Sequence, residues 1–117
     1  MMRKEFIREV FYYEDYYLRF FKTLAPGVKT KFNWTLQLIA SLRMVPEKYF
    51  KHIAGSKGLY EVRVEYGSDI YRVFCFFDEG RLIILLNGFK KTSQKTPLSE
   101  IRMAEKLKEE YYNEKNE

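Results

Sequence analysis

The sequence predicts an α+β fold, in which one antiparallel sheet carries a helical hairpin on one face and is followed by a C-terminal helix. Three observations predict it: three consecutive strand-like segments in the middle of the chain, two amphipathic helical patterns before them and one after them. The expected order of elements is β-α-α-β-β-β-α. With 117 residues, 46% of them hydrophobic, the chain is expected to form a single domain over residues 1–117.

The central strands are expected at residues 59–66, 70–77 and 81–89. Apolar or aromatic side chains occupy every second position of the first one, which is the pattern of a strand with one buried face. The segments Gly67-Ser68-Asp69 and Asp78-Glu79-Gly80 separate the strands and consist of residues favoured in tight turns. The third strand contains the unbroken apolar run Leu82 to Leu86, which favours a place inside the sheet rather than at its edge.

A short strand and two helices are expected before the central strands. The strand covers residues 5–12, and the first helix begins near Glu14-Asp15 and ends at Ala25-Pro26-Gly27. The second helix is expected at about residues 28–44. Trp34 lies off its apolar stripe and is expected to pack against the first helix. Two closely linked amphipathic helices form a hairpin, and the sheet is the surface that their joint apolar face can cover.

The segments that flank the central strands give weaker patterns. Residues 47–52 are expected to form one further helical turn, and the glycine-containing segment 54–58 to form a turn. The C-terminal helix is expected at residues 97–112, because Thr96-Pro97 supplies a favoured N-cap residue and a proline suited to the first helical position. Residues 113–117 are expected to fray.

Composition restricts the classes of protein that the chain can represent. No run approaches the ~18 apolar residues of a membrane span, and the N-terminus lacks the apolar core of a signal peptide, so a cytoplasmic protein is expected. Cys75 is expected to act as a small buried hydrophobic residue, and His52 to be structural or exposed. With one His and one Cys, no zinc site is expected, and no other cofactor is indicated. The net charge of +5 is compatible with nucleic acid, ribosomes or an acidic protein partner.

Charged residues interrupt one face of the predicted sheet. Alternation places Glu61 and Arg63 on the face opposite Val62, and Arg72 on the corresponding face of the next strand. Two interpretations remain open at this point. In the first, the three charged residues are solvated side chains of a one-sided sheet, with one arginine paired to Glu61. In the second, they form a binding surface.

A lysine-rich segment follows the third central strand. Lys90, Lys91 and Lys95 lie between Phe89 and Leu98 without an intervening acid. If this segment bends back towards the two arginines, the five basic side chains converge on a concave surface with aromatic residues nearby, namely Phe74, Phe76 and Phe89. Basic groups contact phosphates and aromatic rings stack on unpaired bases, so such a surface would suit RNA. A solvated lysine loop is the alternative.

These motifs resemble a known family. Tyr71-Arg72-Val73 follows a tight turn, Phe89-Lys90-Lys91 ends the last strand, and Gln94-Lys95-Thr96-Pro97 precedes Glu100-Ile101 at the start of the last helix. In this order and spacing they resemble the HigB-type, phage-derived, Gp49-like branch of the RelE/ParE toxin superfamily. The resemblance extends over essentially the whole chain and implies a RelE-like fold.

The resemblance implies the toxin of a type II toxin–antitoxin pair. Ribosome-dependent relatives cut mRNA in the ribosomal A site without a metal, by attack of a ribose 2′-hydroxyl on the neighbouring phosphate, which leaves a 2′,3′-cyclic phosphate. The implied partners are the ribosome, mRNA and a small antitoxin of the helix-turn-helix type. Two alternatives stay open: a ParE-like toxin that binds gyrase, and a degenerate toxin that binds RNA or protein without catalysis.

The resemblance also suggests residue roles. Arg72 matches the family's strand arginine and is expected to stabilise the phosphorane, with Arg63 next in importance. Lys90 and Lys91 match the basic end of the last strand, where they could bind phosphate or donate a proton. Lys95 and Phe89 are expected to belong to the RNA-binding surface.

Two positions depart from the family pattern. Glu61 stands where RelE-like members carry a basic residue, and it could serve as the general base. Asn87, also expected in the RNA-binding surface, stands where many HigB-like relatives have a histidine. Asn cannot titrate, so this chain lacks that proton carrier.

Overall fold

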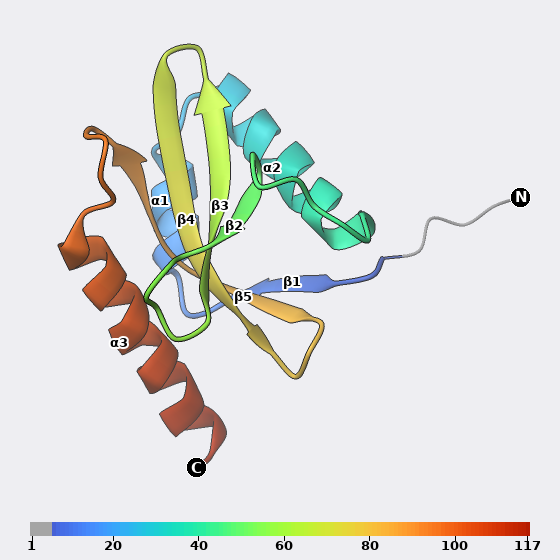
Figure 1. Ribbon diagram of the computed structural model, residues 1–117, viewed down its shortest axis with the longest axis vertical. Helices are drawn as coiled ribbons and strands as arrows, with labels where there is room; N and C mark the ends of the chain where they lie inside the picture. The colour runs from blue at the N-terminus through green and yellow to red at the C-terminus, as the bar shows by residue number, and fades with distance from the viewer. Residues whose placement is uncertain (1–5) are drawn as a thin grey trace, which may run out of the picture.

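The computed structural model describes residues 6–117 as one five-stranded sheet between two helical layers (Figure 1). The strands lie in the order β1-β5-β4-β3-β2. The elements along the chain are β1 (Glu9–Tyr12), α1 (Tyr16–Lys22), α2 (Pro26–Ser41), β2 (Phe50–His52), β3 (Leu59–Tyr66), β4 (Asp69–Asp78), β5 (Leu82–Lys91) and α3 (Leu98–Lys115). The predicted α+β class and the two-helix hairpin before the sheet are confirmed, and β1 falls within the predicted strand at residues 5–12, of which residue 5 lies outside the described residues.

An antiparallel sheet had been expected, but one pair of strands in this sheet is parallel. The pairs β2·β3, β3·β4 and β4·β5 are antiparallel, but β1 runs parallel to β5, with Val10 beside Ile83 (Figure 1). Parallel neighbours require a long connection rather than a tight turn. Here β1 is separated from β5 by most of the chain, so no local turn determines its direction.

The segment 47–52 was predicted as a helical turn, and this is only partly right. Backbone amides of Tyr49 and Phe50 donate to the carbonyl of Pro46, which closes a single turn. The chain then becomes β2, because the Phe50 ring stacks on Tyr60 of β3 at 5.0 Å. An aromatic cross-strand contact of this kind favours a strand over a second helical turn.

The two faces of the sheet bury different sets of side chains. On the hairpin face, Phe32 and Ile39 of α2 are fully buried against Val62 and Val73 of the sheet. On the opposite face, Ala104 and Leu107 of α3 pack with the deeper apolar residues of the strands, including Phe76. The α1–α2 hairpin and α3 therefore cover opposite faces, as the sequence pattern had indicated for the hairpin.

A bulge interrupts the pairing of β4 with β5. Val73 pairs with Gly88, but Cys75 pairs with Leu85, so two residues of β5 oppose Phe74 alone. A single extra residue reverses the direction in which every later side chain of that strand points. Gly88 faces the helical hairpin at close range, because a Cβ there would lie 2.5 Å from the ring of Phe20.

Helix α3 continues to Lys115, so the expectation that residues 113–117 fray is wrong for most of that segment. The Lys115 ammonium donates to Asp78 at 2.8 Å, and this contact anchors the end of the helix to the turn between β4 and β5. Within residues 6–117, none of the helices combines the length and the apolar character that crossing a bilayer requires.

Candidate nucleic-acid interface

The two predicted arginines meet on the sheet face opposite the hairpin. Arg63 of β3 lies directly across from Arg72 of β4, and Arg72 lies across from Phe89 of β5. The next row towards the end of the sheet holds Ile70, with Lys91 across from it. Residues that pair across strands project from the same face, so the two arginines and Lys91 share one surface.

These side chains line a groove of about 500 Å³, which we call the arginine groove. Its walls come from β3, β4, the end of β5 and the loop that leads to α3. The lining residues are Arg63, Glu65, Ile70, Arg72, Lys91, Thr92, Ser93 and Gln94.

Arg72 is buried at the floor of this groove, with 2% of its surface exposed. One of its terminal nitrogens (Nη1) donates to the carbonyl oxygen of Tyr71 at 3.0 Å. Its Nε is buried and has no hydrogen-bond partner among residues 6–117. Burial and the neighbouring Arg63 lower the pKa of Arg72, although nearby glutamates oppose this shift. An arginine remains protonated under these conditions, so the site holds a buried cation whose hydrogen-bonding capacity is largely unused.

Glu61 lies between the two arginines. Its Oε1 is 3.3 Å from Nε of Arg63 and 3.7 Å from Nε of Arg72. Arg63 also donates from Nη1 to the carbonyl oxygen of Glu47 at 3.1 Å. Glu61 therefore pairs with arginine, as one interpretation of the sequence expected. The same interpretation expected solvated side chains, but Arg72 is buried and Glu61 is 8% exposed.

The structure separates the two adjacent lysines. Lys91 lines the arginine groove, whereas Lys90 pairs with Tyr71, whose side chain belongs to the hairpin-side core. The ammonium of Lys90 lies 3.3 Å from a carboxylate oxygen of Asp69. The expectation that both lysines converge on the arginines is therefore wrong for Lys90, because the bulge at Phe74 decides which of the two points to this face.

Lys95 also stays apart from the arginine groove. It is exposed, and its carbonyl oxygen accepts a hydrogen bond from Ser93 Oγ at 2.8 Å. Its ammonium is not part of the groove lining. The residues that the sequence prediction missed are its polar neighbours Thr92, Ser93 and Gln94. The available signal was their position in the short loop between Lys91 and Pro97. A short loop that starts at a groove residue lies close to the groove.

The aromatic residues expected near the basic groups are buried in the core. Phe74 and Phe76 are fully buried, and Phe89 is 9% exposed. The ring of Phe89 meets that of Phe74 edge to face at 5.3 Å. These rings support the strand positions of the arginines and are not available to stack on a base.

Asn87 has a structural contact. Its amide nitrogen donates to the carbonyl oxygen of Glu100 at 3.1 Å and to the Glu100 side chain at 3.0 Å. These bonds tie the bulge of β5 to the first turn of α3. Asn87 does not line the arginine groove, so the expectation that it contacts RNA finds no support in the geometry.

The remaining candidates lie elsewhere. His52 is exposed on β2 with its ring against Tyr60, and Cys75 is fully buried, with its thiol pKa raised by burial. Both placements agree with the sequence prediction. Among residues 6–117, no group of three or more His, Cys, Asp or Glu side chains is arranged to hold a metal ion.

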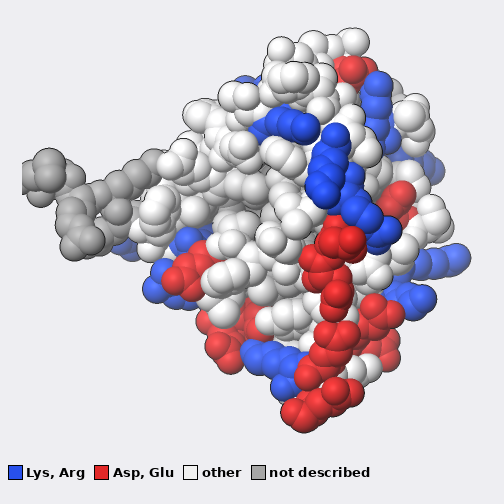
Figure 2. Space-filling model, turned by 180° about the vertical axis from the view of Figure 1, so that it is seen from behind, with Lys and Arg blue, Asp and Glu red and all other residues white. Residues whose placement is uncertain are grey.

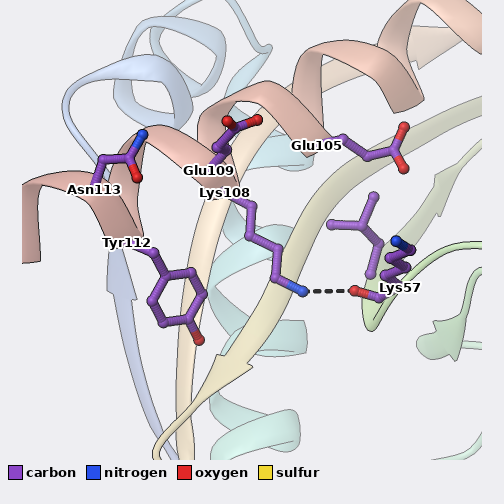
Figure 3. A pocket seen from close by; sticks show the side chains of 7 residues that line it. Lys57, Glu105, Lys108, Glu109, Tyr112 and Asn113 are labelled. Atoms are coloured by element: carbon purple, nitrogen blue, oxygen red, sulfur yellow. Dashed lines mark hydrogen bonds between the residues drawn. The ribbon is translucent and has the colours of Figure 1, made fainter. Parts of the chain in front are cut away.

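A mainly apolar pocket of about 330 Å³ lies between α3 and the segment before β3 (Figure 3). Lys108 crosses it and donates to the carbonyl oxygen of Lys57 at 2.6 Å. Glu105 and Glu109 stand on its helical side (Figure 3). None of the groove arginines contributes to this pocket, so it is separate from the arginine groove.

Charge is also divided across the molecule. Seen from behind, acidic side chains form a band that runs from the middle of this face towards the lower end, and Lys and Arg side chains lie above the band and on both sides of it (Figure 2). The lower end carries the C-terminal part of α3, which contains Glu109, Glu110 and Glu114. Lys108 and Lys115 accompany these glutamates, so this end is less favourable for a polyanion than the arginine groove without being uniformly acidic.

Comparison with known proteins identifies the family and the fold. A family model described as "Phage derived protein Gp49-like" matches residues 19–109. A solved structure of a doubly substituted E. coli toxin RelE in the free state is similar in fold, with a TM-score of 0.54, 13% sequence identity, and coverage of 70% of this chain and 81% of that one. No curated protein sequence matches the chain. The match of the family model over most of the chain confirms the resemblance drawn from the sequence motifs: the chain belongs to the Gp49-like family of phage-derived proteins and has a RelE-like fold.

Proposed function

We propose that this protein is the toxin of a type II toxin–antitoxin pair and that it cuts mRNA on the ribosome, in the cytoplasm. The observation that carries the proposal is the buried, incompletely hydrogen-bonded Arg72 at the floor of a groove that also presents Arg63 and Lys91. Three cations from three strands at one site suit a phosphodiester, because phosphate oxygens accept several charge-assisted hydrogen bonds at once. The family implies an antitoxin partner, which we propose is of the helix-turn-helix type.

The proposed reaction is transfer of the phosphodiester from the 5′-oxygen to the 2′-oxygen. Glu61 accepts the proton of the ribose 2′-hydroxyl, whose oxygen attacks the adjacent phosphorus. Because Glu61 is 8% exposed and lies outside the groove lining, this step requires its carboxylate to turn towards the groove when RNA binds. Arg72 and Arg63 stabilise the negative charge that develops on the equatorial oxygens. Lys91 donates a proton to the 5′-oxygen as its bond to phosphorus breaks. The products are a 2′,3′-cyclic phosphate and a 5′-hydroxyl.

Alignment of the mRNA by the ribosome would compensate for the limited acid–base assistance at this site. The Glu61 carboxylate is already engaged before RNA binds, because its Oε1 lies 3.3 Å from Nε of Arg63 and 3.7 Å from Nε of Arg72. Asn87 supplies no titratable group. Holding the substrate in an attack geometry can replace a large part of the missing acid–base assistance.

The test is to map mRNA 5′ ends in cells after the protein is induced. New ends inside translated codons, each carrying a 5′-hydroxyl, are the expected result. DNA breaks without new mRNA ends would point to a gyrase-directed toxin and would contradict the proposal.

A second candidate function is RNA binding without cleavage. It is favoured by one observation, namely that Asn87, at the position of the family histidine, is engaged with Glu100. Growth arrest together with protected, uncut ribosome-bound mRNA would select it over the nuclease.

A further inference from the structure

A second groove adjoins the arginine groove. It has a volume of about 220 Å³ and is lined by Lys31, Lys48, Tyr49, Arg63, Glu65 and Gly67. Arg63 and Glu65 line both grooves, so the two grooves are neighbours at the end of β3. We call the second groove the Tyr49 groove.

The Tyr49 groove exists because β2 is short. β2 pairs with only three residues of β3, ending at Val62. Beyond Val62 the turn before β2 takes the place of a strand, and the Arg63 amide donates to the carbonyl oxygen of Tyr49 at 2.8 Å. On the other side, the ammonium of Lys31 in α2 donates to the carbonyl oxygen of Glu65. Three separate elements therefore fix the walls of this groove.

The Tyr49 groove combines cations with one lining aromatic residue, Tyr49, which the exposed Trp34 contacts from outside the lining. The Lys48 ammonium lies over the Tyr49 ring at 5.4 Å. Trp34 meets the same ring edge to face at 5.4 Å and is 47% exposed. Trp34 was predicted to pack against the first helix. Its ring instead contacts Tyr49 in the turn before β2. Here, unlike in the arginine groove, aromatic surface is exposed next to basic groups.

The charge of the two grooves is strongly positive. Together they are lined by five basic side chains and one acidic side chain, Glu65. Basic grooves with an aromatic residue beside them are the arrangement by which proteins bind single-stranded nucleic acid without reading its sequence.

We propose that the Tyr49 groove binds the single-stranded RNA that flanks the scissile phosphate. In this proposal Lys48, which lies over the Tyr49 ring at 5.4 Å, turns to contact a phosphate, and one base stacks on the ring face that Lys48 leaves. The inference rests on the proposed function, because it takes the arginine groove as the place where the scissile phosphate lies. It adds the path by which the RNA leaves that groove, over Arg63 and towards the turn before β2.

The test compares RNAs of two lengths. Binding of fluorescent, 2′-O-methylated single-stranded RNA is measured by anisotropy, with one RNA of about three nucleotides and one of about nine, a range that spans typical single-strand site sizes. The variants are Lys48→Ala, Tyr49→Ala, the conservative Tyr49→Phe, and Arg72→Lys for the arginine groove. Lys106→Ala is the matched control, because it removes an exposed lysine from α3.

Loss of the Tyr49 ring is expected to weaken binding of the longer RNA by about tenfold, the effect of one lost base stack. Lys48→Ala is expected to reduce the log–log salt slope by about 0.7, the effect of one lost phosphate contact. Both variants should bind the shorter RNA as the wild type does. Tyr49→Phe, which keeps the ring, and Lys106→Ala should bind both RNAs normally.

Other outcomes separate this inference from the proposed function. If Arg72→Lys weakens binding of both RNAs while Lys48→Ala and Tyr49→Ala change neither, the Tyr49 groove is not an RNA path, although the proposed function stands. If these two variants lose antitoxin binding instead of RNA binding, the groove is a protein contact and the inference is wrong. If the wild type binds neither RNA, the Tyr49 groove is not a site for single-stranded RNA and the inference is wrong, whereas the proposed function is decided by the mapping of mRNA 5′ ends.

Discussion

The two ends of β4 treat a buried charge in opposite ways. Arg72 and Asp78 lie on the same strand, and their surfaces are 2% and 3% exposed. Asp78 accepts hydrogen bonds from Tyr111 at 2.6 Å, from Lys115 at 2.8 Å and from Tyr112 at 3.3 Å. Arg72 makes one hydrogen bond to a backbone oxygen and leaves its buried Nε without a partner among residues 6–117.

The difference is in how far the protein itself compensates each charge, and we propose that it separates a structural charge from a functional one. A buried charge is costly unless hydrogen bonds and an opposite charge compensate for its lost hydration. At Asp78 the fold supplies that compensation, and the result is an anchored α3. At Arg72 the fold supplies less, namely one backbone hydrogen bond and the Glu61 carboxylate at 3.7 Å from Nε, so donors remain for the anionic ligand that we propose.

The largest expected effect is at Arg72. Arg72→Ala should abolish growth arrest, because removing one preorganised cation from a phosphoryl-transfer site costs on the order of 10²–10³ in rate. Arg72→Lys should also lose most activity, since lysine lacks the planar set of donors. The measurement is colony formation after induction, with circular dichroism and antitoxin binding to show that the fold is retained. Arrest by the alanine variant at the wild-type level would remove Arg72 from the mechanism.

At the other end of the strand, the expected loss is in stability. Asp78→Ala leaves Tyr111 and Tyr112 without their acceptor and leaves Lys115 with the exposed Glu79 alone, so it should lower the free energy of unfolding by about 2–3 kcal/mol, the usual range for charged hydrogen bonds. Growth arrest should persist at temperatures where the variant is folded. Glu79→Ala is the control, because it removes only the exposed partner of Lys115 and should change stability by less than about 0.5 kcal/mol. Urea unfolding measures both, and equal losses would show that burial of Asp78 is unimportant.

Adjacent lysines should differ in their effect on RNA binding. Lys91 lines the arginine groove, whereas Lys90 pairs with Asp69. Lys91→Ala should weaken binding of single-stranded RNA and reduce the log–log salt slope by about 0.7. Lys90→Ala should leave that slope unchanged. The reverse result would mean that the bulge in β5 is not at the position described.

The smallest effect concerns pH. Burial alone would raise the pKa of Asp78, but the hydrogen bonds from Lys115 and Tyr111 outweigh it and lower the pKa below its ordinary value of 3.8. A depressed carboxyl pKa contributes stability above the unfolded pKa, and this contribution is lost as pH falls through the folded value. The urea concentration at the unfolding midpoint of the wild type should therefore decrease as the pH is lowered below about 4. The midpoint of Asp78→Asn should decrease less steeply over the same range. Parallel curves for the two proteins would assign the acid sensitivity to other carboxyls.

The sequence predicted what depends on local alternation. The strand positions of Arg63 and Arg72, their shared face and the turn residues between them all follow from a period of two along β3 and β4. Simple alternation does not reveal the bulge, which reverses the sides of Lys90 and Lys91. Gly88 was its one visible trace, and a glycine in a strand has several explanations.

What sequence reasoning missed depends on contacts between distant segments. The anchoring of Lys115 to Asp78 joins the end of α3 to a turn far back in the chain, so the helix end looked free to fray. The burial of Phe89 follows from packing of the strands beneath α3. The Tyr49 groove needs α2, β3 and the turn before β2 together, and no single segment indicates it.

The most direct test of Arg72 as a phosphate site is NMR of the side-chain Nε–H signals of arginine. The protein would be titrated with single-stranded RNA whose 2′-hydroxyls are methylated, so that it binds without being cut. The signals of Arg72 and Arg63 should shift with one common dissociation constant, while the backbone amides of Asp78 and Lys115 stay in place. Unchanged arginine signals, with shifts confined to the Asp78 end of the sheet, would contradict the assignment of the scissile phosphate to the arginine groove.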